Sequence, residues 1–329
     1  MSKGVIGVLV PFKISRQAPS DRPISSALST DLGITVVFGS ELSVISNTVH
    51  MDGVTVSDGR WKSECLAVSA IHDRYPSQIR STQYRKVLSC LGDTPMGNPL
   101  SITLLCRDKI RCQRWLETVV PMPPVLEDHS LFNRAMKEWH KAYLKPQFGA
   151  LGTNVHFVQA GEQLAEFLPG VVPHKAEPTI LQKAITPPRD WAGLCVRQLI
   201  SRAPDGGWKC YPAVLRRSRT DSVVNVARGA EAVLAEDHLS AECMERIIAL
   251  SVHAARRLEE HEDGEWAVEF GIDFVIDEHY NPWLIEVNSR PRGRLEVLSQ
   301  VDPMRFAALH HQAVISPIIY LYEKTKRGF

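Results

Sequence analysis

The feature that most constrains this chain is residues 269–291, EFGIDFVIDEHYNPWLIEVNSRP, where two apolar runs flank a short polar segment. Turn-forming residues between two apolar runs predict an antiparallel hairpin. If Asp277 pairs with Pro282, the loop between them has four residues, a common hairpin length. Counting back along both strands then places Asp273 directly opposite Glu286.

The two carboxylates and a neighbouring amide form a candidate metal site. Side chains alternate along a strand, so Asn288 lies on the same face as Glu286 and Asp273. Like charges directly across a strand pair repel, by up to about 1 kcal/mol on a surface and more where water is excluded. A divalent cation removes this repulsion, and three oxygen donors suit magnesium. The alternative is a strand pair with one solvated polar face.

Bulk composition excludes several classes of protein. The chain has 329 residues, enough for two or three packed lobes, and its 44% hydrophobic and 23% charged residues are typical of a soluble globular enzyme. Its 38 basic and 37 acidic residues give a net charge of +1, so we expect no nucleic-acid partner. It has no apolar run long enough to cross a membrane. Seven cysteines without a CxxC pair argue against a disulfide framework or a zinc site, and indicate a cytoplasmic location.

Apolar runs that alternate with helix-like stretches predict an open α/β sheet in the first hundred residues. The expected strands there are 5–10, 34–38 and 66–71, with a helix at 25–32 and a hairpin turn at Asp52-Gly53 between residues 42–46 and 54–56. Proline-rich segments at 119–125 and 186–188 indicate lobe boundaries. We therefore expect three units, at 1–107, 108–187 and 188–329.

Further elements are expected in the second and third units. The second unit should contain strands at 142–146, 155–159 and 179–185 and a helix at 162–167. The third should contain strands at 195–200, 208–215 and 223–226. Its clearest helix starts near the N-cap Ser240 and runs to about residue 260, and a last helix spans about 304–325.

The pattern GIDFxID…WLIEVNSRP resembles the metal-binding end of ATP-grasp ligases, and more closely the YheC/YheD, spore-coat-associated branch of that superfamily. The resemblance extends over most of the chain. It implies a three-lobed ATP-grasp fold: an N-terminal α/β domain, a small lid and a larger C-terminal α+β domain. It also implies ATP and Mg²⁺ as cofactors, with ATP between lid and core. The implied reaction is phosphoryl transfer from ATP to a carboxylate, followed by attack of an amine or another nucleophile on the acyl phosphate.

Two lysines are candidates for binding the nucleotide phosphates. Lys145 ends a predicted strand and precedes a loop in which Gly149 and Gly152 let backbone N–H groups approach an anion. A simple turn between strands is the alternative for this loop. The resemblance implies that it is the lid loop over the triphosphate and that Lys145 contacts phosphate. Lys109 resembles the lysine that opens the first helix after the N-terminal domain, and is otherwise an ordinary surface lysine.

The strand at 179–185 resembles the hinge between lobes, where backbone groups and a polar side chain hold adenine. The residues implied to bind the nucleotide here are Gln182, Lys183 and Ile185. Gln182 replaces the Glu that many family members carry. Because Gln can both donate and accept without charge, it can still hold adenine.

Arg197 and Arg217 are the candidate catalytic cations, together with Asn225. Arg197 matches the arginine of an Asp-x-Arg pattern in the family, with Cys195 in place of the aspartate, and would stabilise an acyl phosphate or clamp a substrate carboxylate. We interpret Cys195 as a packing residue. One of Arg216, Arg217 and Arg219, followed by Asn225, falls where the family has Arg and then Asn. A solvated basic turn is the alternative.

The substrates implied are a small-molecule or peptide carboxylate and an amine or other nucleophile, in natural-product or cell-surface metabolism. Asp73 and Arg74, at a strand end, are candidates for substrate contact, or else pair with each other. A different class of function also fits the resemblance, namely a non-catalytic or regulatory, spore-coat-type scaffold that binds nucleotide. The sequence leaves open whether the chain forms a homodimer.

Overall fold

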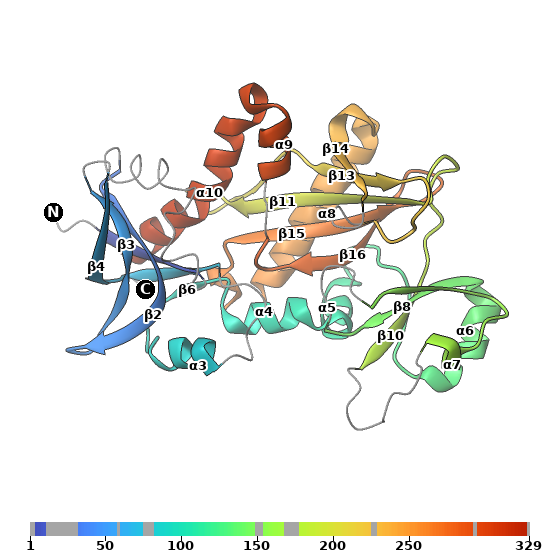
Figure 1. Cartoon of the computed structure of the whole chain (residues 1–329), viewed down its shortest axis with the longest axis horizontal. Coiled ribbons are helices and arrows are strands. Elements are labelled where there is room, and N and C mark those ends of the chain that lie inside the picture. The colour runs from blue at the N-terminus through green and yellow to red at the C-terminus, as the bar shows by residue number, and fades with distance from the viewer. Residues whose placement is uncertain are drawn as a thin grey trace.

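The computed structural model describes residues 4–10, 32–57, 60–74, 82–148, 154–167, 178–224, 229–291 and 295–327. Within these ranges the strands form three sheets, which follow one another along the longest axis of the molecule (Figure 1). Among the described helices, none is long and apolar enough to cross a membrane.

The first sheet combines a parallel core with an antiparallel extension. Its order is β4-β3-β2-β1-β5-β6, with β1 parallel to β2 and β5 and with β2, β3 and β4 antiparallel. The helix α3 (Thr82–Ser89) lies beside it (Figure 1). The strands are β1 (Gly4–Leu9), β2 (Ile34–Ile45), β3 (Thr48–Ser57), β4 (Arg60–Ala67), β5 (Ala70–Asp73) and β6 (Met96–Gly97). The predicted helix at 25–32 lies outside the described residues.

The turn predicted at Asp52-Gly53 is wrong. The chain reverses at Ser46 and Asn47, whose φ angles are +48° and +62°, and Asp52-Gly53 lies inside β3 opposite a bulge in β2. Glycine is required at position 53 for another reason: a Cβ there would lie 2.2 Å from the carbonyl oxygen of Phe38. The predicted strand 66–71 is also two strands, the end of β4 and the start of β5.

The second sheet is small and antiparallel, in the order β7-β10-β8-β9. Its predicted strands and helix are confirmed, with ends shifted by one or two residues. The helices α6 and α7 enclose a core of their own with it. The elements are β7 (Val125–Leu126), α6 (Phe132–Trp139), β8 (Lys141–Pro146), β9 (His156–Gln159), α7 (Leu164–Phe167) and β10 (Thr179–Lys183), with a 3₁₀ turn at His129–Leu131.

The third sheet lies in the centre of the molecule and has the order β14-β13-β11-β15-β16, with β12 beside β11. The predicted strand 208–215 is two strands, and residues 223–224 are not in a strand, while 225–226 lie outside the described residues. The strands are β11 (Gly193–Arg202), β12 (Trp208–Cys210), β13 (Val214–Ser218), β14 (Glu231–Leu234), β15 (Glu269–Ile276) and β16 (Pro282–Asn288).

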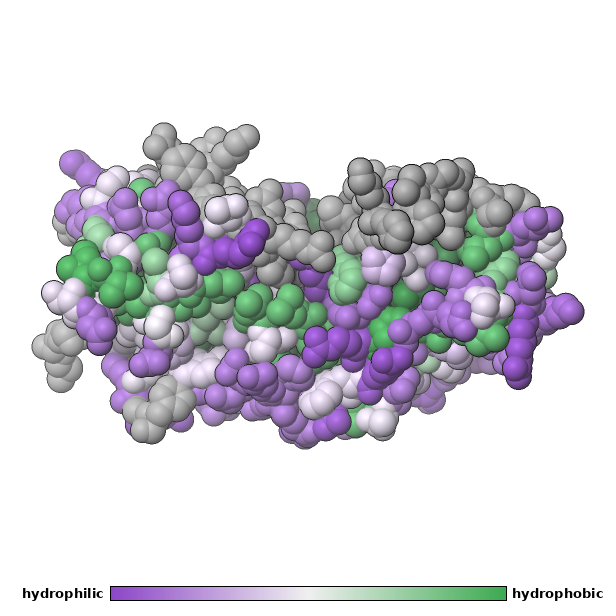
Figure 2. Space-filling view, turned by 90° about the horizontal axis from the view of Figure 1, so that it is seen from below, coloured by the Kyte–Doolittle hydropathy of each residue, from purple (hydrophilic) through white to green (hydrophobic). Residues whose placement is uncertain are grey.

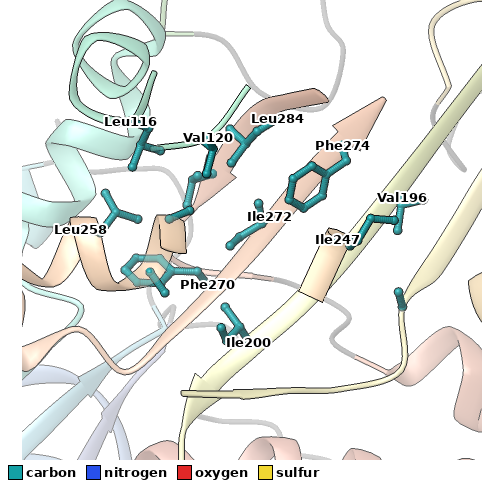
Figure 3. Close-up of a cluster of buried hydrophobic side chains, with 14 of the residues drawn as sticks. Leu116, Val120, Val196, Ile200, Ile247, Leu258, Phe270, Ile272, Phe274 and Leu284 are labelled. Atoms are coloured by element: carbon teal, nitrogen blue, oxygen red, sulfur yellow. The ribbon is translucent and has the colours of Figure 1, made fainter. Parts of the chain in front are cut away.

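One face of the third sheet carries the largest core. The helix α8 (Ala241–Glu259), with α4 (Leu100–Arg107) and α5 (Lys109–Leu116), contributes buried side chains to this core. Figure 3 shows alternate residues of β15, namely Phe270, Ile272 and Phe274, packed among side chains of β11, α5 and α8. The predicted N-cap is confirmed, because the Ser240 hydroxyl accepts from the N–H of Cys243. The intervening residues of β15 therefore face the opposite side of the sheet.

The last helix, α10 (Pro303–Lys326), joins the first sheet to the third, and its predicted extent is confirmed. Ile318 and Leu321 pack against β1, whereas Phe306 and Ala313 belong to a cluster with Leu199 of β11. The short helix α9 (Glu296–Val301) precedes it, and 3₁₀ turns occur at Ala235–Asp237 and Gly264–Trp266. A face seen in Figure 2 carries an apolar band that runs from the end formed by the first sheet toward the middle.

Candidate functional site

The hairpin of β15 and β16 places Asp273 opposite Glu286, as predicted. The predicted pairing at the turn is wrong, because Pro282 pairs with Ile276 and the loop has one residue more. A bulge at Ile285 compensates for this difference by adding one residue to β16 between Leu284 and Glu286. The bulge is what brings the two carboxylates level on the face that lies away from the large core.

Asp273 is buried and is held by an arginine from the neighbouring strand. Arg197 pairs with Asp273 across β11 and β15, and its Nε and Nη2 atoms donate to the two carboxylate oxygens. The Nη2 atom of Arg216, on β13, lies 3.8 Å from Asp273 Oδ1. Burial disfavours the charged guanidinium, but the adjacent Asp273 carboxylate outweighs it and raises the pKa of Arg197.

Glu286 and Asn288 complete the oxygen-bearing group. The amide nitrogen of Asn288 lies 3.4 Å from Asp273 Oδ2. With the amide turned over, its nitrogen donates to Glu286 Oε1 at 3.1 Å and its oxygen accepts from Arg197 Nη2 at 3.2 Å. Glu286 is half-buried, and it forms no ion pair with another described residue. The three predicted ligands therefore adjoin one another.

The donor set fits magnesium. It consists of two carboxylates and one amide, all oxygen donors, and the three groups lie within hydrogen-bonding distance along a continuous chain. Within the described ranges, no group of three His, Cys, Asp or Glu side chains could hold a metal ion. A site for zinc or another metal that prefers imidazole or thiolate is therefore not indicated in that part of the chain.

The second sheet supplies a buried lysine to the same region. The Nζ atom of Lys145, on β8, donates to Oε1 of Gln182, on β10, at 2.6 Å, and both side chains are buried. Burial and the nearby Lys109 lower the pKa of Lys145 to about 7, and Glu286 opposes this shift. Lys109 and Glu286 thus lie close enough to Lys145 to influence the charge on its amine.

Lys109 begins α5, as predicted, and is tied to the strand that carries Lys145. Asp108 caps this helix by accepting from the N–H groups of Ile110 and Arg111. The side-chain amide of Gln147, two residues after Lys145, donates to Asp108 Oδ1 at 2.8 Å, and the backbone carbonyl of Gln147 accepts from the N–H of Lys109 at 3.3 Å. These bonds fix the end of β8 to the start of α5.

The hinge segment offers backbone groups at its end. The N–H of Lys183 donates to the carbonyl oxygen of Pro124, and the N–H of Ala184 donates to the carbonyl oxygen of Lys141. No backbone hydrogen bond between described residues involves Ile185. Gly149, Gly152 and Asn225 lie outside the described residues.

Arg217 is not brought to this cluster. It lies one residue from Arg216 on β13, so its side chain projects from the other face, where it donates to both carboxylate oxygens of Glu231 at 2.8 and 3.0 Å. Its guanidinium also stacks on Trp191. Arg216 is the member of the arginine group that reaches Asp273, because it pairs with Cys195 across β11 and β13. The alternation rule finds Arg216 only once that register is known.

Cys195 is buried beside Asp273. Burial first, and then the nearby carboxylate, raise the pKa of its thiol to about 12. The thiolate required of a nucleophile is therefore scarce at neutral pH, in agreement with the prediction of a packing residue.

Asp73 is buried at the junction between the first and third sheets. It accepts from Tyr84 and forms an ion pair with Arg290, two residues after Asn288. Nearby, the side chain of Asn98 accepts from the N–H of Val268 and donates to the carbonyl oxygens at positions 269 and 289. No local sequence pattern predicts these contacts, because the residues that form them are far apart along the chain.

The family described as YheC/D like ATP-grasp matches residues 106–304, more than half of the chain. The chain belongs to this ATP-grasp family. No curated protein matches its sequence.

Solved ATP-grasp structures share the fold. D-alanyl-alanine synthetase A from Vibrio cholerae matches with a TM-score of 0.59 at 15% identity, covering 97% of this chain and 99% of that one. The D-alanine-D-alanine ligase from Coxiella burnetii matches with 0.62 at 13%, covering 99% and 97%. The ATP-grasp ligase PsnB, solved with a minimal precursor, matches with 0.56 at 16%, covering 96% and 100%. The predicted ATP-grasp fold is thereby confirmed.

Proposed function

We propose that this protein is an ATP- and magnesium-dependent ligase that activates a carboxylate as an acyl phosphate and transfers it to an amine or a related nucleophile. The observation that carries the proposal is the convergence of Asp273, Glu286 and Asn288 on one face of the central sheet, within electrostatic reach of Lys145. Membership of the ATP-grasp family supports the general reaction class.

In this proposal Asp273, Glu286 and Asn288 hold Mg²⁺, which supplies charge stabilisation to the phosphate oxygens. Lys145 and Lys109 bind the phosphates, together with the loop containing Gly149 and Gly152. Gln182, Lys183 and the backbone groups of Ile185, which make no backbone hydrogen bond with a described residue, hold the adenine edge. ATP then lies between lid and core, with the lobes divided at 1–107, 108–187 and 188–329.

Arg197 and Arg216 supply the fixed positive charge that an acyl phosphate needs. Both project from the face that carries Asp273, so they lie beside the phosphates rather than behind the sheet. Arg216 takes the role expected of Arg217, and Asn225 keeps its proposed role. An approaching phosphate would favour the charged form of Lys145, so nucleotide binding near pH 8 would draw a proton onto its amine.

The substrates we propose are an amino acid or a short peptide. One of the similar structures is named a D-alanyl-alanine synthetase, another is named a D-alanine-D-alanine ligase, and the third was solved with a minimal precursor. The test is ADP release in the presence of ATP, Mg²⁺ and candidate amino acids and peptides.

Glu286→Gln should abolish Mg²⁺-dependent ADP release while the protein stays folded, because the amide removes one anionic ligand without changing size. Glu278→Gln, in the exposed turn of the same hairpin, is the matched control and should retain activity. Full activity in Glu286→Gln would refute the metal assignment. ATP-dependent thermal stabilisation without turnover on any substrate would instead favour the nucleotide-binding scaffold.

A further inference from the structure

The guanidinium of Arg197 occupies the same oxygens that the proposed metal requires. It donates to both oxygens of Asp273, and with the Asn288 amide turned over it also binds that amide's oxygen at 3.2 Å. Two of the three proposed ligands are thus engaged by one protein cation. Glu286, the third, forms no ion pair among the described residues.

The position of Arg197 depends on a glycine in the adjacent strand. A Cβ on Gly271 would lie 3.2 Å from both Cδ and Nη1 of Arg197 and 3.1 Å from Cβ of Pro291. These distances are tighter than ordinary van der Waals contact. The Arg197 side chain therefore crosses the strand above Gly271, where any other residue would press against it.

We propose that Arg197 competes with the divalent cation for Asp273. The absence of a side chain at Gly271 leaves the space through which the Arg197 side chain reaches this carboxylate. The inference rests on the proposed metal site. Asp273 is buried, so its charge requires a partner, and the two-point contact with Arg197 provides one. A divalent cation on the same oxygens would share the charge of Asp273 with the guanidinium and so weaken the two-point contact.

The competition couples metal binding to the orientation of the Arg197 guanidinium. While Nε and Nη2 of Arg197 both donate to Asp273, these N–H groups are not available to a ligand. Once a cation takes the carboxylate, the guanidinium can turn toward an anion on the same face. Arg197 is a positioning residue for Asp273 in the first arrangement and a potential anion contact in the second.

Titration with Mn²⁺ alone, in the absence of nucleotide, tests the proposal. Binding is measured from the loss of the electron paramagnetic resonance signal of unbound Mn²⁺. Arg197→Lys keeps the positive charge but loses the two-point geometry, so it should bind Mn²⁺ at least about tenfold more tightly than the unchanged protein. If net repulsion alone governs affinity, Arg197→Lys will leave it unchanged, and this result would overturn the proposal.

Arg217→Lys is the matched control, because Arg217 makes the same two-point contact with Glu231 on the opposite face of the sheet. Its Mn²⁺ affinity should stay within about twofold of the unchanged protein. Gly271→Ala is a second test, since it keeps Arg197 and reduces only the space available to its side chain. It should also tighten Mn²⁺ binding, by a smaller factor, and weaker binding in both folded variants would contradict the competition.

Failure of the metal site itself gives a different result. Glu286→Gln should weaken Mn²⁺ binding in the unchanged background and in Arg197→Lys. If Glu286→Gln binds Mn²⁺ as the unchanged protein does, the proposed metal site is wrong. If Glu286→Gln weakens binding but Arg197→Lys does not strengthen it, only the competition is wrong.

Discussion

The buried Lys145 should destabilise the protein at neutral pH, so replacing it with methionine should raise stability. Its pKa falls from 10.5 to about 7, chiefly because burial disfavours the charged amine. At about 1.4 kcal/mol per pH unit, this difference corresponds to at most ~5 kcal/mol. The Lys145→Met variant leaves Gln182 Oε1 without its donor, at a cost of about 1–3 kcal/mol. We expect a net gain of about 2 kcal/mol at pH 7, or several degrees in Tm.

The pH dependence gives this prediction its sign. The pKa of Lys145 is lower in the folded protein than in the unfolded chain, so the unfolded chain binds more protons between about pH 7 and 10.5. The stability of the unchanged protein should therefore rise with pH across that window. The stability of Lys145→Met relative to the unchanged protein should fall by roughly 3 kcal/mol between pH 7 and pH 9.5, so its advantage of about 2 kcal/mol should become a deficit of about 1 kcal/mol.

Chemical denaturation of both proteins at pH 7 and pH 9.5 measures this advantage directly. Gln182→Met is the control, because it removes the same hydrogen bond and keeps the lysine. A stability difference between Lys145→Met and the unchanged protein that does not vary with pH would refute the argument from burial. Lys145→Met should also lose thermal stabilisation by ATP and Mg²⁺, because it lacks the lysine that we propose binds the phosphates.

Two further predictions concern other parts of the molecule. Arg216→Gln should reduce ADP release by about 10- to 1000-fold, and by at least ten times more than Arg217→Gln, because only Arg216 lies on the face of Asp273. Steady-state kinetics check this, and equal losses would show that the face does not matter. Asn98→Ala should cost about 2–4 kcal/mol of unfolding free energy, because it removes the hydrogen-bond partner of buried backbone groups at positions 268, 269 and 289, across the junction between the first and third sheets. Urea denaturation measures the loss, and a change below about 0.5 kcal/mol would contradict it.

Local patterns determined much of the fold. The N-cap Ser240, the periodic apolar residues of α8 and α10 and the apolar strands of the second sheet were all predictable, because each depends on neighbours within a few residues. The turn at Ser46-Asn47 was missed because Asp52-Gly53 is the stronger turn signal. That pair is instead needed for close backbone contact at a bulge, which depends on a partner strand.

The opposition of Asp273 and Glu286 was predicted through a wrong loop pairing, and the bulge at Ile285 restored it. Sequence periodicity assumes regular strands, so it cannot locate a bulge. The alternation of carboxylates and apolar residues in this hairpin still identified the face that carries the site, because one face must be buried.

What the sequence by itself determined is the set of oxygen-bearing side chains that share one face of one hairpin, and the elements whose residues are close along the chain. Only the tertiary structure decided that Arg216, and not Arg217, reaches Asp273, that Arg197 holds that carboxylate from above Gly271, and that Lys145 meets Gln182 in a buried pair. These contacts join strands whose pairing and register depend on packing across the whole sheet. A shift of one residue would turn each side chain to the opposite face.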